Sequence, residues 1–326
     1  MKIKNKIMEK VEKYGFIEQD GSYLVEPRFE RAESFSEGLA VVIENGKYGF
    51  IYRTGKIVIE PKYIWASSFE NGVARVRDEN KDCYINIKGE IISEEEADST
   101  SGFYKGGLSK ALGAVISRQA YMLPNGDMIV EPASSDFSEG LGKYEHQTNH
   151  MLDYKFGFMD EEKKIVIAAQ FDEVEDFSEG FAAVCYEGKW CFVDKQGEFV
   201  FDKTFDECWG FHEGLAKVKV DGLIGYIDTK GNYVIHPQYY VGSNFSDGLA
   251  FVQKNKNEDL GYIDMENNMV IPPKYNCLGI FKEGRAFAGK DKRYGLINKK
   301  GEYLIEPKFR HAEPFQEGFA VVSLEK

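Results

Sequence analysis

The chain has 326 residues, of which 43% are hydrophobic and 14% aromatic, so it holds enough apolar material for an extensive core. Lysine and arginine number 41 against 54 acids, for a formal net charge of −13. A surface this acidic repels phosphate backbones, so we expect no nucleic-acid partner. The opening "MKIKNKIMEKVEKYGF" has no apolar signal-peptide core, and no later run approaches membrane-spanning length. We therefore expect no membrane association.

The cysteine pattern bears on the compartment. The five cysteines are odd in number and form no CxxC pair. Reduced thiols in a cytoplasmic protein fit this pattern best.

Two marker glycines recur along the chain at a period near 34 residues. The first ends an "FSEG"-type tetrad and occurs at Gly38, Gly72, Gly107, Gly140, Gly180, Gly214, Gly248, Gly284 and Gly318. The second stands in "YGFI"-type strings at Gly15, Gly49, Gly157, Gly225, Gly261 and Gly295, with Cys83, Ala120 and Cys191 in three further slots. Such self-similarity predicts a single repeat array over residues 1–326, with degenerate repeats around residues 83–140.

Each repeat reads as three β-strands in succession. In the second repeat "LAVVIE" (Leu39–Glu44) is a short apolar run, "KYGFIYR" (Lys47–Arg53) alternates, and "KIVIEP" (Lys56–Pro61) ends at a proline. The dipeptides "NG" and "TG" between them are typical of tight hairpins. No segment has an apolar stripe of helical period. The sequence therefore predicts an all-β tandem array of about nine three-stranded meanders of 34–37 residues.

One hairpin turn is much longer than the others. The segment "KYEHQTNHMLD" (Lys143–Asp153) is an insertion in the first turn of its repeat, and it holds Tyr144, His146, His150 and Met151. Insertions in repeat proteins often lie on the binding face. We expect a projecting tip that contacts a partner, although tolerated drift in loop length remains an alternative. The two histidines alone are too few for a metal site, and we expect no cofactor.

The motifs resemble those of bacterial WG-repeat (KWG-repeat) proteins. The likeness rests on "NGKYGFIYRTGKIVIEPKY", "EGKWCFVDKQGEF" and the recurring "FSEG", and it covers nearly all of the chain. The tryptophan of the motif occurs once at its slot, as Lys189-Trp190, and there Cys191 replaces the glycine. The resemblance implies a β-repeat scaffold and brings no catalytic residues.

The shape of the array has two possible forms. The chain begins in the second strand of a repeat and ends after the first strand of another, as in a closed β-propeller. However, nine repeats of three strands differ from the usual four to eight four-stranded blades. Residues 3–10 can also supply a partial first strand. We therefore predict an open, curved or superhelical stack, with a closed propeller as the alternative.

The tetrad supplies two further expectations. Its phenylalanine, as in Phe35 and Phe69, should be a core plug between repeats. Its acid, as in Glu37, should accept hydrogen bonds from nearby turn amides beside a glycine with positive φ. If the sheet is continuous, equivalent acids lie about 14 Å apart. They then cannot share a cation, so a metal ladder is the weaker interpretation.

The remaining aromatic residues of interest are Trp65, Trp209, Tyr239 and Tyr240. They lie in the connections between repeats and do not recur at one slot, so the fold does not demand them. Partial burial is one interpretation and ligand contact the other. As candidate binding residues we take Tyr144, His146, His150, Trp65, Trp209 and Tyr240.

Catalytic motifs are absent from the sequence. It has no G-x-S-x-G, no phosphate-binding loop, no dinucleotide fingerprint and no H-E-x-x-H. A non-catalytic scaffold that binds another protein in a bacterial cytoplasm is the leading prediction. Recognition of a carbohydrate or cell-envelope polymer through exposed aromatics is a second possibility, and a propeller-type hydrolase a third.

Overall fold

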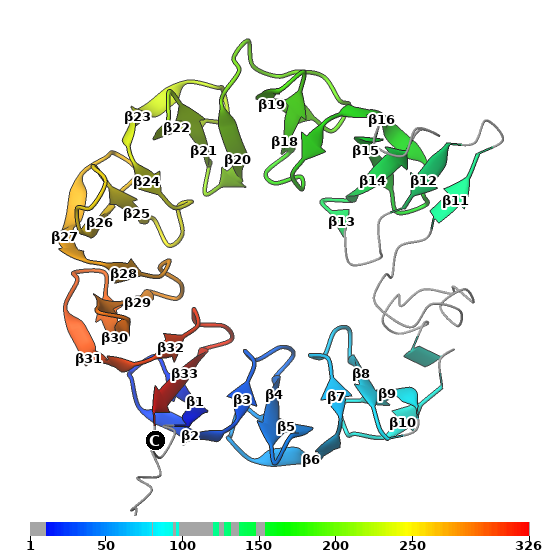
Figure 1. Ribbon diagram of the computed structural model, residues 1–326, viewed down its shortest axis with the longest axis vertical. Helices are drawn as coiled ribbons and strands as arrows, with labels where there is room; N and C mark the ends of the chain where they lie inside the picture. Colours follow the sequence, from blue (N-terminus) through cyan, green and yellow to red (C-terminus); the bar gives the residue numbers. More distant parts are fainter. Residues whose placement is uncertain are drawn as a thin grey trace, which may run out of the picture. The chain divides into compact units, whose positions relative to one another are not determined.

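A computed structural model describes residues 11–79, 81–93, 96–97, 120–123, 127–131, 137–147 and 154–325. Every named element in these residues is a β-strand, and the strands form small antiparallel sheets (Figure 1). This confirms the prediction of an all-β repeat protein. Within the described part of the chain, no helix has the length and apolar character needed to cross a bilayer. The chain divides into two compact units, residues 1–102 with 270–326 (unit 1) and residues 103–269 (unit 2).

The second repeat shows how one sheet is built. Its strands are β3 (Arg31–Ala32), β4 (Leu39–Glu44), β5 (Lys47–Tyr52) and β6 (Ile57–Tyr63), and they pair in the order β3-β4-β5-β6. Asn45 and Gly46 join β4 to β5 with φ of 52° and 69°, as a two-residue hairpin turn requires. The three predicted strands are confirmed. The two-residue strand β3 is an addition, because it is too short to leave an alternating pattern.

The marker glycine of β5 is required by a bulge between β5 and β6. Tyr48 pairs with Tyr63 and Phe50 with Ile59, so three residues of β6 face Gly49 alone. A Cβ on Gly49 would lie 2.6 Å from the Ile59 carbonyl oxygen and 2.6 Å from the Pro61 nitrogen. Only glycine permits this approach. Proline suits the facing position because it has no N–H to leave without an acceptor.

Repeats that lack this glycine lose much of the third strand. Beside Cys191 the third strand is reduced to the isolated bridges Trp190–Phe205 and Val193–Phe199. Beside Cys83 the third strand, β10, has only two residues. Both cysteine side chains are buried, as predicted for small replacements of glycine. The extra atoms therefore hold the third strand away from the second.

Unit 1 contains four complete sheets. Beyond β3–β6, their orders are β2-β1-β33-β32, β10-β9-β8-β7 and β28-β29-β30-β31. The strands are β1 (Glu12–Glu18), β2 (Tyr23–Phe29), β7 (Trp65–Ala66), β8 (Val73–Arg77), β9 (Asp82–Asn86), β10 (Ile91–Ile92), β28 (Cys277–Leu278), β29 (Arg285–Lys290), β30 (Arg293–Asn298), β31 (Tyr303–Phe309), β32 (His311–Ala312) and β33 (Phe319–Glu325). The boundary between the units falls in β27 (Met269–Tyr275).

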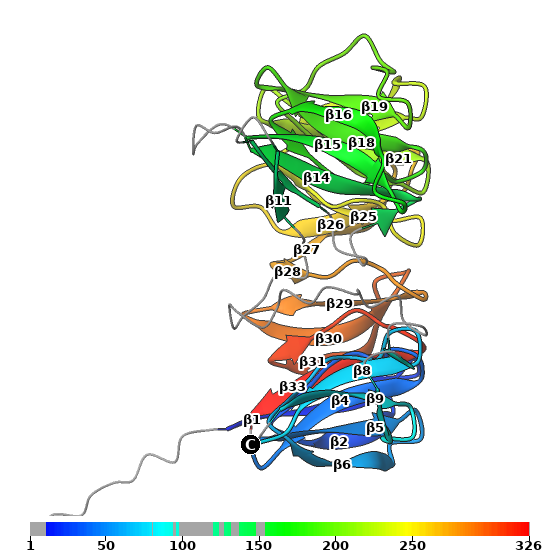
Figure 2. The same cartoon turned by 90° about the vertical axis from the view of Figure 1, so that its right-hand side faces the viewer.

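The two ends of the chain share one sheet of unit 1. Strand β33 pairs with β1 from Glu12–Glu325 to Glu18–Phe319, and the two strands lie side by side in both views (Figure 1 and Figure 2). The C-terminal segment thus supplies the first strand of the sheet whose second and third strands are β1 and β2. Residues 3–10, which the sequence also allowed as a partial first strand, lie outside the described residues.

Unit 2 departs more from the regular repeat. Its first sheet has the order β11-β12-β14-β15-β16, and β13 also pairs with β14. The next sheets have the orders β17-β18-β19, β20-β21-β22-β23 and β24-β25-β26. The strands are β11 (Ala120–Met122), β12 (Met128–Val130), β13 (Phe137–Ser138), β14 (Leu141–Gln147), β15 (Tyr154–Asp160), β16 (Ile165–Phe171), β17 (Glu173–Val174), β18 (Phe181–Tyr186), β19 (Lys189–Asp194), β20 (Glu207–His212), β21 (Leu215–Val220), β22 (Leu223–Asp228), β23 (Tyr233–Tyr239), β24 (Val241–Gly242), β25 (Ala250–Gln253) and β26 (Leu260–Ile263).

The core of each unit lies between the faces of successive sheets. The tetrad phenylalanine of one repeat packs on the aromatic ring that follows the marker glycine of the preceding repeat. Ring centroids are 5.0 Å apart for Phe50 and Phe69 and 4.9 Å apart for Tyr226 and Phe245. All four rings are buried. The prediction that the tetrad phenylalanine is a core plug between repeats is confirmed.

The tetrad acids also connect neighbouring repeats. The Gly72 amide donates to Glu37 at 2.7 Å, and the Gly214 amide donates to Glu179 at 2.9 Å. Glu213 accepts from two amides of the next turn. The predicted role as a turn carboxylate is therefore confirmed, but the amides belong to the next repeat. The 14 Å spacing expected for a continuous sheet is wrong, because each repeat forms its own sheet and successive tetrad turns are in contact.

Candidate functional site

The predicted tip at residues 143–153 is in part an extension of a regular hairpin. Strands β14 and β15 pair as far as Gln147 and Tyr154. Tyr144 is buried with 2% exposure, and its hydroxyl accepts a hydrogen bond from the Ala169 amide at 2.8 Å. The placement of Tyr144 in an exposed tip is therefore wrong, because strand alternation turns its ring into the core.

Of the two histidines of this segment, the structure describes only His146. The ring of His146 lies 3.2 Å from Asp127 of the preceding β11–β12 hairpin. His150 and Met151 lie outside the described residues.

The connection aromatics differ in exposure. In unit 1, Trp65 of β7 is 40% exposed. In unit 2, Tyr240 follows β23 and is 44% exposed, whereas Tyr239 is buried and its hydroxyl donates to Asn267. Partial burial holds for Trp65 and Tyr240, and each keeps a large accessible surface.

Trp209 occupies the most distinctive of these positions. It lies in β20, whose six residues combine the short first strand and the tetrad-turn pairing that the second repeat shows separately, as β3 and the Ser36–Leu39 bridge. Strand β20 forms the edge of its sheet (Figure 1). Its pairing with β21 shifts between Cys208 and Phe211, so Trp209 and Gly210 form a bulge. A bulge re-aims side chains, and such features often lie beside functional sites.

Two charged groups accompany the Trp209 ring. The Lys217 ammonium lies 3.9 Å from the ring centroid, in cation–π contact. Burial lowers the pKa of Lys217 and raises the pKa of Glu175 on the preceding repeat. The charge of Lys217 is among the influences that act on Glu175, so the two groups are neighbours. We call Glu175, Trp209 and Lys217 the β20 cluster.

Ion pairs lie on either side of the β20 cluster. Lys143 pairs with Asp176 at 2.9 Å, and Lys219 pairs with Glu207 at 2.7 Å. The cluster thus offers an aromatic face, an ammonium and a carboxyl group on two adjacent sheets of unit 2. This combination can hold a polar or charged group against an apolar surface.

Sequence reasoning found Trp209 but missed its two partners. Glu175 and Trp209 stand two residues before the tetrad phenylalanines Phe177 and Phe211, at the same position of successive repeats. Lys217 stands at a slot that is apolar in most repeats, as at Val41 and Ala183, and basic at Arg75 and Lys143. Alignment of the repeats at these two positions carries the signal that could have found the cluster.

Comparison with known proteins identifies the repeat. A family model described as WG containing repeat matches residues 14–48, 48–81, 156–190, 192–223, 224–257, 261–294 and 294–326, well over half of the chain. No curated protein matches the chain.

Solved structures give likeness of fold alone. One described as "Crystal structure of the eukaryotic initiation factor" is 10% identical, with a TM-score of 0.51 over 96% of this chain and 98% of that chain. A streptogramin B lyase structure is 11% identical, with a TM-score of 0.30 over 96% of this chain and 98% of that chain. The second score is too low to support a conclusion. From the repeat matches, the chain belongs to the WG-containing repeat family.

Proposed function

We propose that this chain is a non-catalytic repeat scaffold that binds another protein in a bacterial cytoplasm, with the β20 cluster as part of the binding surface. The observation that carries the proposal is the position of Trp209 in the bulge of β20, where its ring contacts the partly buried Lys217 ammonium. The equivalent position holds Glu33, Ser243 or Gly279 in other repeats. The tryptophan is therefore not required by the repeat fold.

The energetics of the cluster support the same conclusion. Burial acts against the charged forms of both Glu175 and Lys217. Partly buried charges of this kind reduce stability unless a partner compensates them, and they concentrate at functional sites. Tryptophan is among the residues that contribute most to protein–protein affinity. A polar partner group placed against Trp209 would recover part of the cost of burial.

The proposed compartment is supported by the thiols. The five cysteines are free, and four of them are buried. Burial raises the pKa of Cys191 to about 11, so this thiol is a poor nucleophile and is protected from oxidation. The net charge of −13 favours a partner that presents a basic surface.

The proposal is tested by comparing three baits in an extract of the source bacterium. Wild-type protein, Trp209→Ala and Trp65→Ala are immobilised, and the captured proteins are identified by mass spectrometry. Trp65 is the control because it is also a tryptophan of a first strand and is more exposed than Trp209. We expect a protein that wild type and Trp65→Ala capture and Trp209→Ala does not. Its purified form should bind Trp209→Ala at least about tenfold more weakly than wild type.

Two outcomes would count against the proposal. If wild type and Trp209→Ala capture the same proteins with equal affinity, the β20 cluster is not the binding surface. If only Trp65→Ala loses the partner, the surface lies on unit 1. Lys217→Met keeps the aliphatic stem over the ring and removes the charge, so it separates lost packing from lost electrostatics.

A further inference from the structure

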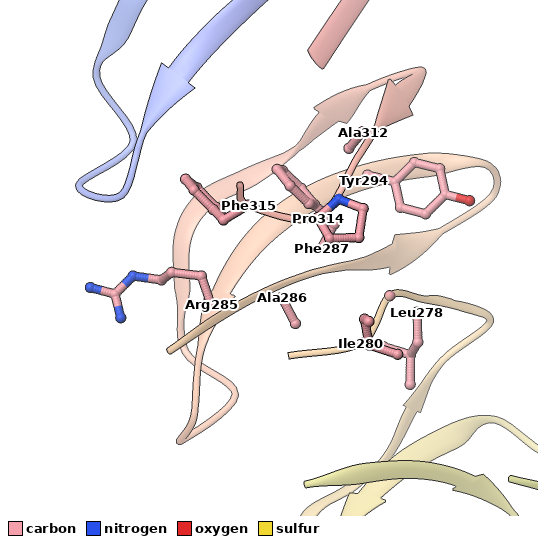
Figure 3. Close-up of a pocket in the computed structure, with 10 residues that line it drawn as sticks. Leu278, Ile280, Arg285, Ala286, Phe287, Tyr294, Ala312, Pro314 and Phe315 are labelled. Carbon is pink, nitrogen blue, oxygen red and sulfur yellow. The ribbon is translucent and has the colours of Figure 1, made fainter. Parts of the chain in front are cut away.

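The pocket of unit 1 that Figure 3 shows selects no class of ligand. It lies beside Phe287 and Phe315, it is partly open, and polar as well as apolar groups line it. The edge of a sheet in unit 2 is a more specific surface. This edge is strand β16, which ends the order β11-β12-β14-β15-β16 and pairs with β15 alone among the described strands. It lies outside the β20 cluster and does not depend on the function proposed for it.

The edge strands of a sheet are usually protected against pairing with another chain. Charged side chains and proline at the edge are common means of protection. Three third strands carry both, as Glu26-Pro27-Arg28 of β2, Glu60-Pro61-Lys62 of β6 and Glu306-Pro307-Lys308 of β31. Strands β23 and β27 keep the proline, as Pro237 and Pro273. In β16 the same positions hold Ala168, Ala169 and Gln170, so this edge lacks both kinds of protection.

The backbone of β16 presents hydrogen-bonding groups on the side away from β15. The Ala169 amide points toward the sheet, because it donates to the Tyr144 hydroxyl at 2.8 Å. Successive amides of an extended strand point to opposite sides, so those of Ala168 and Gln170 point away from the sheet. Both residues are exposed, and Val166 on the same side of the strand is 41% exposed. The edge therefore offers backbone groups beside an accessible apolar side chain.

The charges that flank β16 have opposite signs at its two ends. Lys163 and Lys164 precede the strand, and Asp172 and Glu173 follow it. When two copies of such a strand pair antiparallel, the basic end of each copy meets the acidic end of the other. The sequence around β16 is therefore complementary to itself in one orientation, and this complementarity favours a second copy of the chain as the partner.

We propose that β16 pairs antiparallel with β16 of a second copy of this chain, with Ala168 of each copy at the two-fold axis. This register brings the outward-facing residues together, because Ala168 meets Ala168 and Val166 meets Gln170 of the second copy. The methyl side chain of Ala168 lets the two strands approach at the axis. The pairing joins two sheets into one through main-chain hydrogen bonds, in a symmetric dimer.

The same register forms ion pairs at both ends of the interface. Lys164 is exposed and lies opposite Asp172 of the second copy. Asp172 already pairs with Lys155 of its own sheet, and the exposed Glu173 beside it supplies a second carboxylate. Each end of the joined strands thus holds charges of both signs, and no like charges stand opposite each other alone.

The first test measures the mass of the full chain by sedimentation velocity at rising concentration. We expect wild type to form a dimer. Ala168→Glu installs the residue that β6 and β31 carry at this position, so the variant should fold, but it sets two carboxylates against each other at the axis. The dissociation constant of the dimer should rise at least about tenfold. His236→Glu makes the same change at the equivalent position of β23 and should leave the dimer intact.

A second variant tests the ion pairs and keeps the proposal testable if Ala168→Glu does not fold. Lys164→Glu puts an acid opposite Asp172, so it should weaken the dimer at low salt. The difference from wild type should shrink in about 1 M salt, where charges are screened within a few ångströms. Lys56→Glu is the matched control, because Lys56 is the exposed lysine at the equivalent position before β6.

Cross-linking tests the register in a Cys277→Ser background, since the other four cysteines are buried. Val166→Cys and Gln170→Cys place thiols opposite each other across the interface. A short bis-maleimide should therefore join a mixture of these two variants more efficiently than either variant alone. The proposal is wrong if wild type stays a monomer up to about 100 µM. It is also wrong if folded Ala168→Glu keeps the dimer, or if each variant alone cross-links as well as the mixture.

Discussion

The carboxylate of Glu317 offers a direct test of how the tetrad turns hold successive repeats together. One oxygen accepts the Glu37 amide at 2.9 Å, and the other accepts the Gly38 amide at 3.0 Å and Arg53 Nε at 3.1 Å. Glu317→Gln keeps the shape of the side chain but replaces one acceptor oxygen with an NH₂ donor. That donor must face an N–H group, so at least one hydrogen bond between repeats is lost.

The expected loss of stability follows from the exposure of these groups. Hydrogen bonds to a charged group contribute about 1.5–3 kcal/mol. The side chain of Glu317 is 24% exposed, so its amide bonds keep much of this value, whereas Arg53 is 50% exposed and its ion pair adds little. We expect Glu317→Gln to lower the free energy of unfolding by about 2 kcal/mol.

The loss should depend on pH in a defined direction. Burial acts to raise the pKa of Glu317, but the hydrogen bonds from Arg53 and Gly38 outweigh it, and the pKa lies below its usual value of 4.5. A carboxylate with a lowered pKa stabilises the folded state above its unfolded pKa and loses this contribution as the pH falls through the folded pKa. The difference between wild type and variant should therefore disappear in acid.

Urea unfolding of the full chain at about pH 7 and at about pH 3 measures both effects. Glu306→Gln is the control, because Glu306 is an exposed acid on a third strand. We expect the control to change the unfolding free energy at neutral pH by less than about 0.5 kcal/mol. Equal free energies of unfolding for the two variants at neutral pH would refute the stabilising role of Glu317.

Three other predictions follow from the close contacts and titrating groups. Gly49→Ala places a Cβ 2.6 Å from backbone atoms of β6 and should lower the free energy of unfolding in urea by about 3 kcal/mol. Gly279→Ala should lower it by less than about 1 kcal/mol, and equal losses would contradict the requirement for glycine opposite the β5–β6 bulge. The hydrogen bond between His311 and Glu313 raises the pKa of the histidine and lowers that of the acid. His311→Gln should therefore lower the free energy of unfolding at about pH 5.5 and change it little at about pH 9. An equal loss of stability at both pH values would assign another role to the pair. Cys191, with its pKa raised to about 11, should resist iodoacetamide in the native protein and react after unfolding, as mass spectrometry would show; rapid native labelling would contradict its burial.

Much of the repeat was predictable because its signals are local. The run Leu39–Glu44 forms β4 with the predicted bounds, and the Asn45-Gly46 turn has the positive φ values that its composition indicates. The tetrad phenylalanine was predicted as a core plug from its recurrence alone. Period, turn dipeptides and apolar runs were sufficient for these features because each is set by neighbouring residues in the chain.

Features that depend on contacts between repeats were harder to predict. The carboxylate of Glu37 was assigned the correct kind of bond but the wrong turn, because the sequence does not show that each repeat forms a separate sheet. Tyr144 was assigned to a loop, since spacing alone does not reveal that β14 continues through the insertion as far as Gln147. Strand pairing decides which residues of an insertion project and which point inward.

The candidate site was predictable only in part for the same reason. Trp209 was found because it has no counterpart in the other repeats. Lys217 lies beside it on the paired strand β21, whereas Glu175 comes near Lys217 only because two sheets pack together. The sequence holds no direct sign of that approach, as charged residues are frequent in every repeat.

The two positions just before the tetrad phenylalanine differ between repeats. Trp209 and Gly279 stand two residues before it, and Gly210 and Pro314 stand one residue before it. Where glutamate and serine occupy these positions at successive repeats, they bridge the junction, as Glu33 and Ser68 do.

The phenylalanine, the marker glycine and the tetrad turn hold the repeat together whatever stands at these two positions. Substitution there changes the surface at a junction without disturbing the core. This pair of positions therefore differs between repeats while the strands around it keep the same pairing.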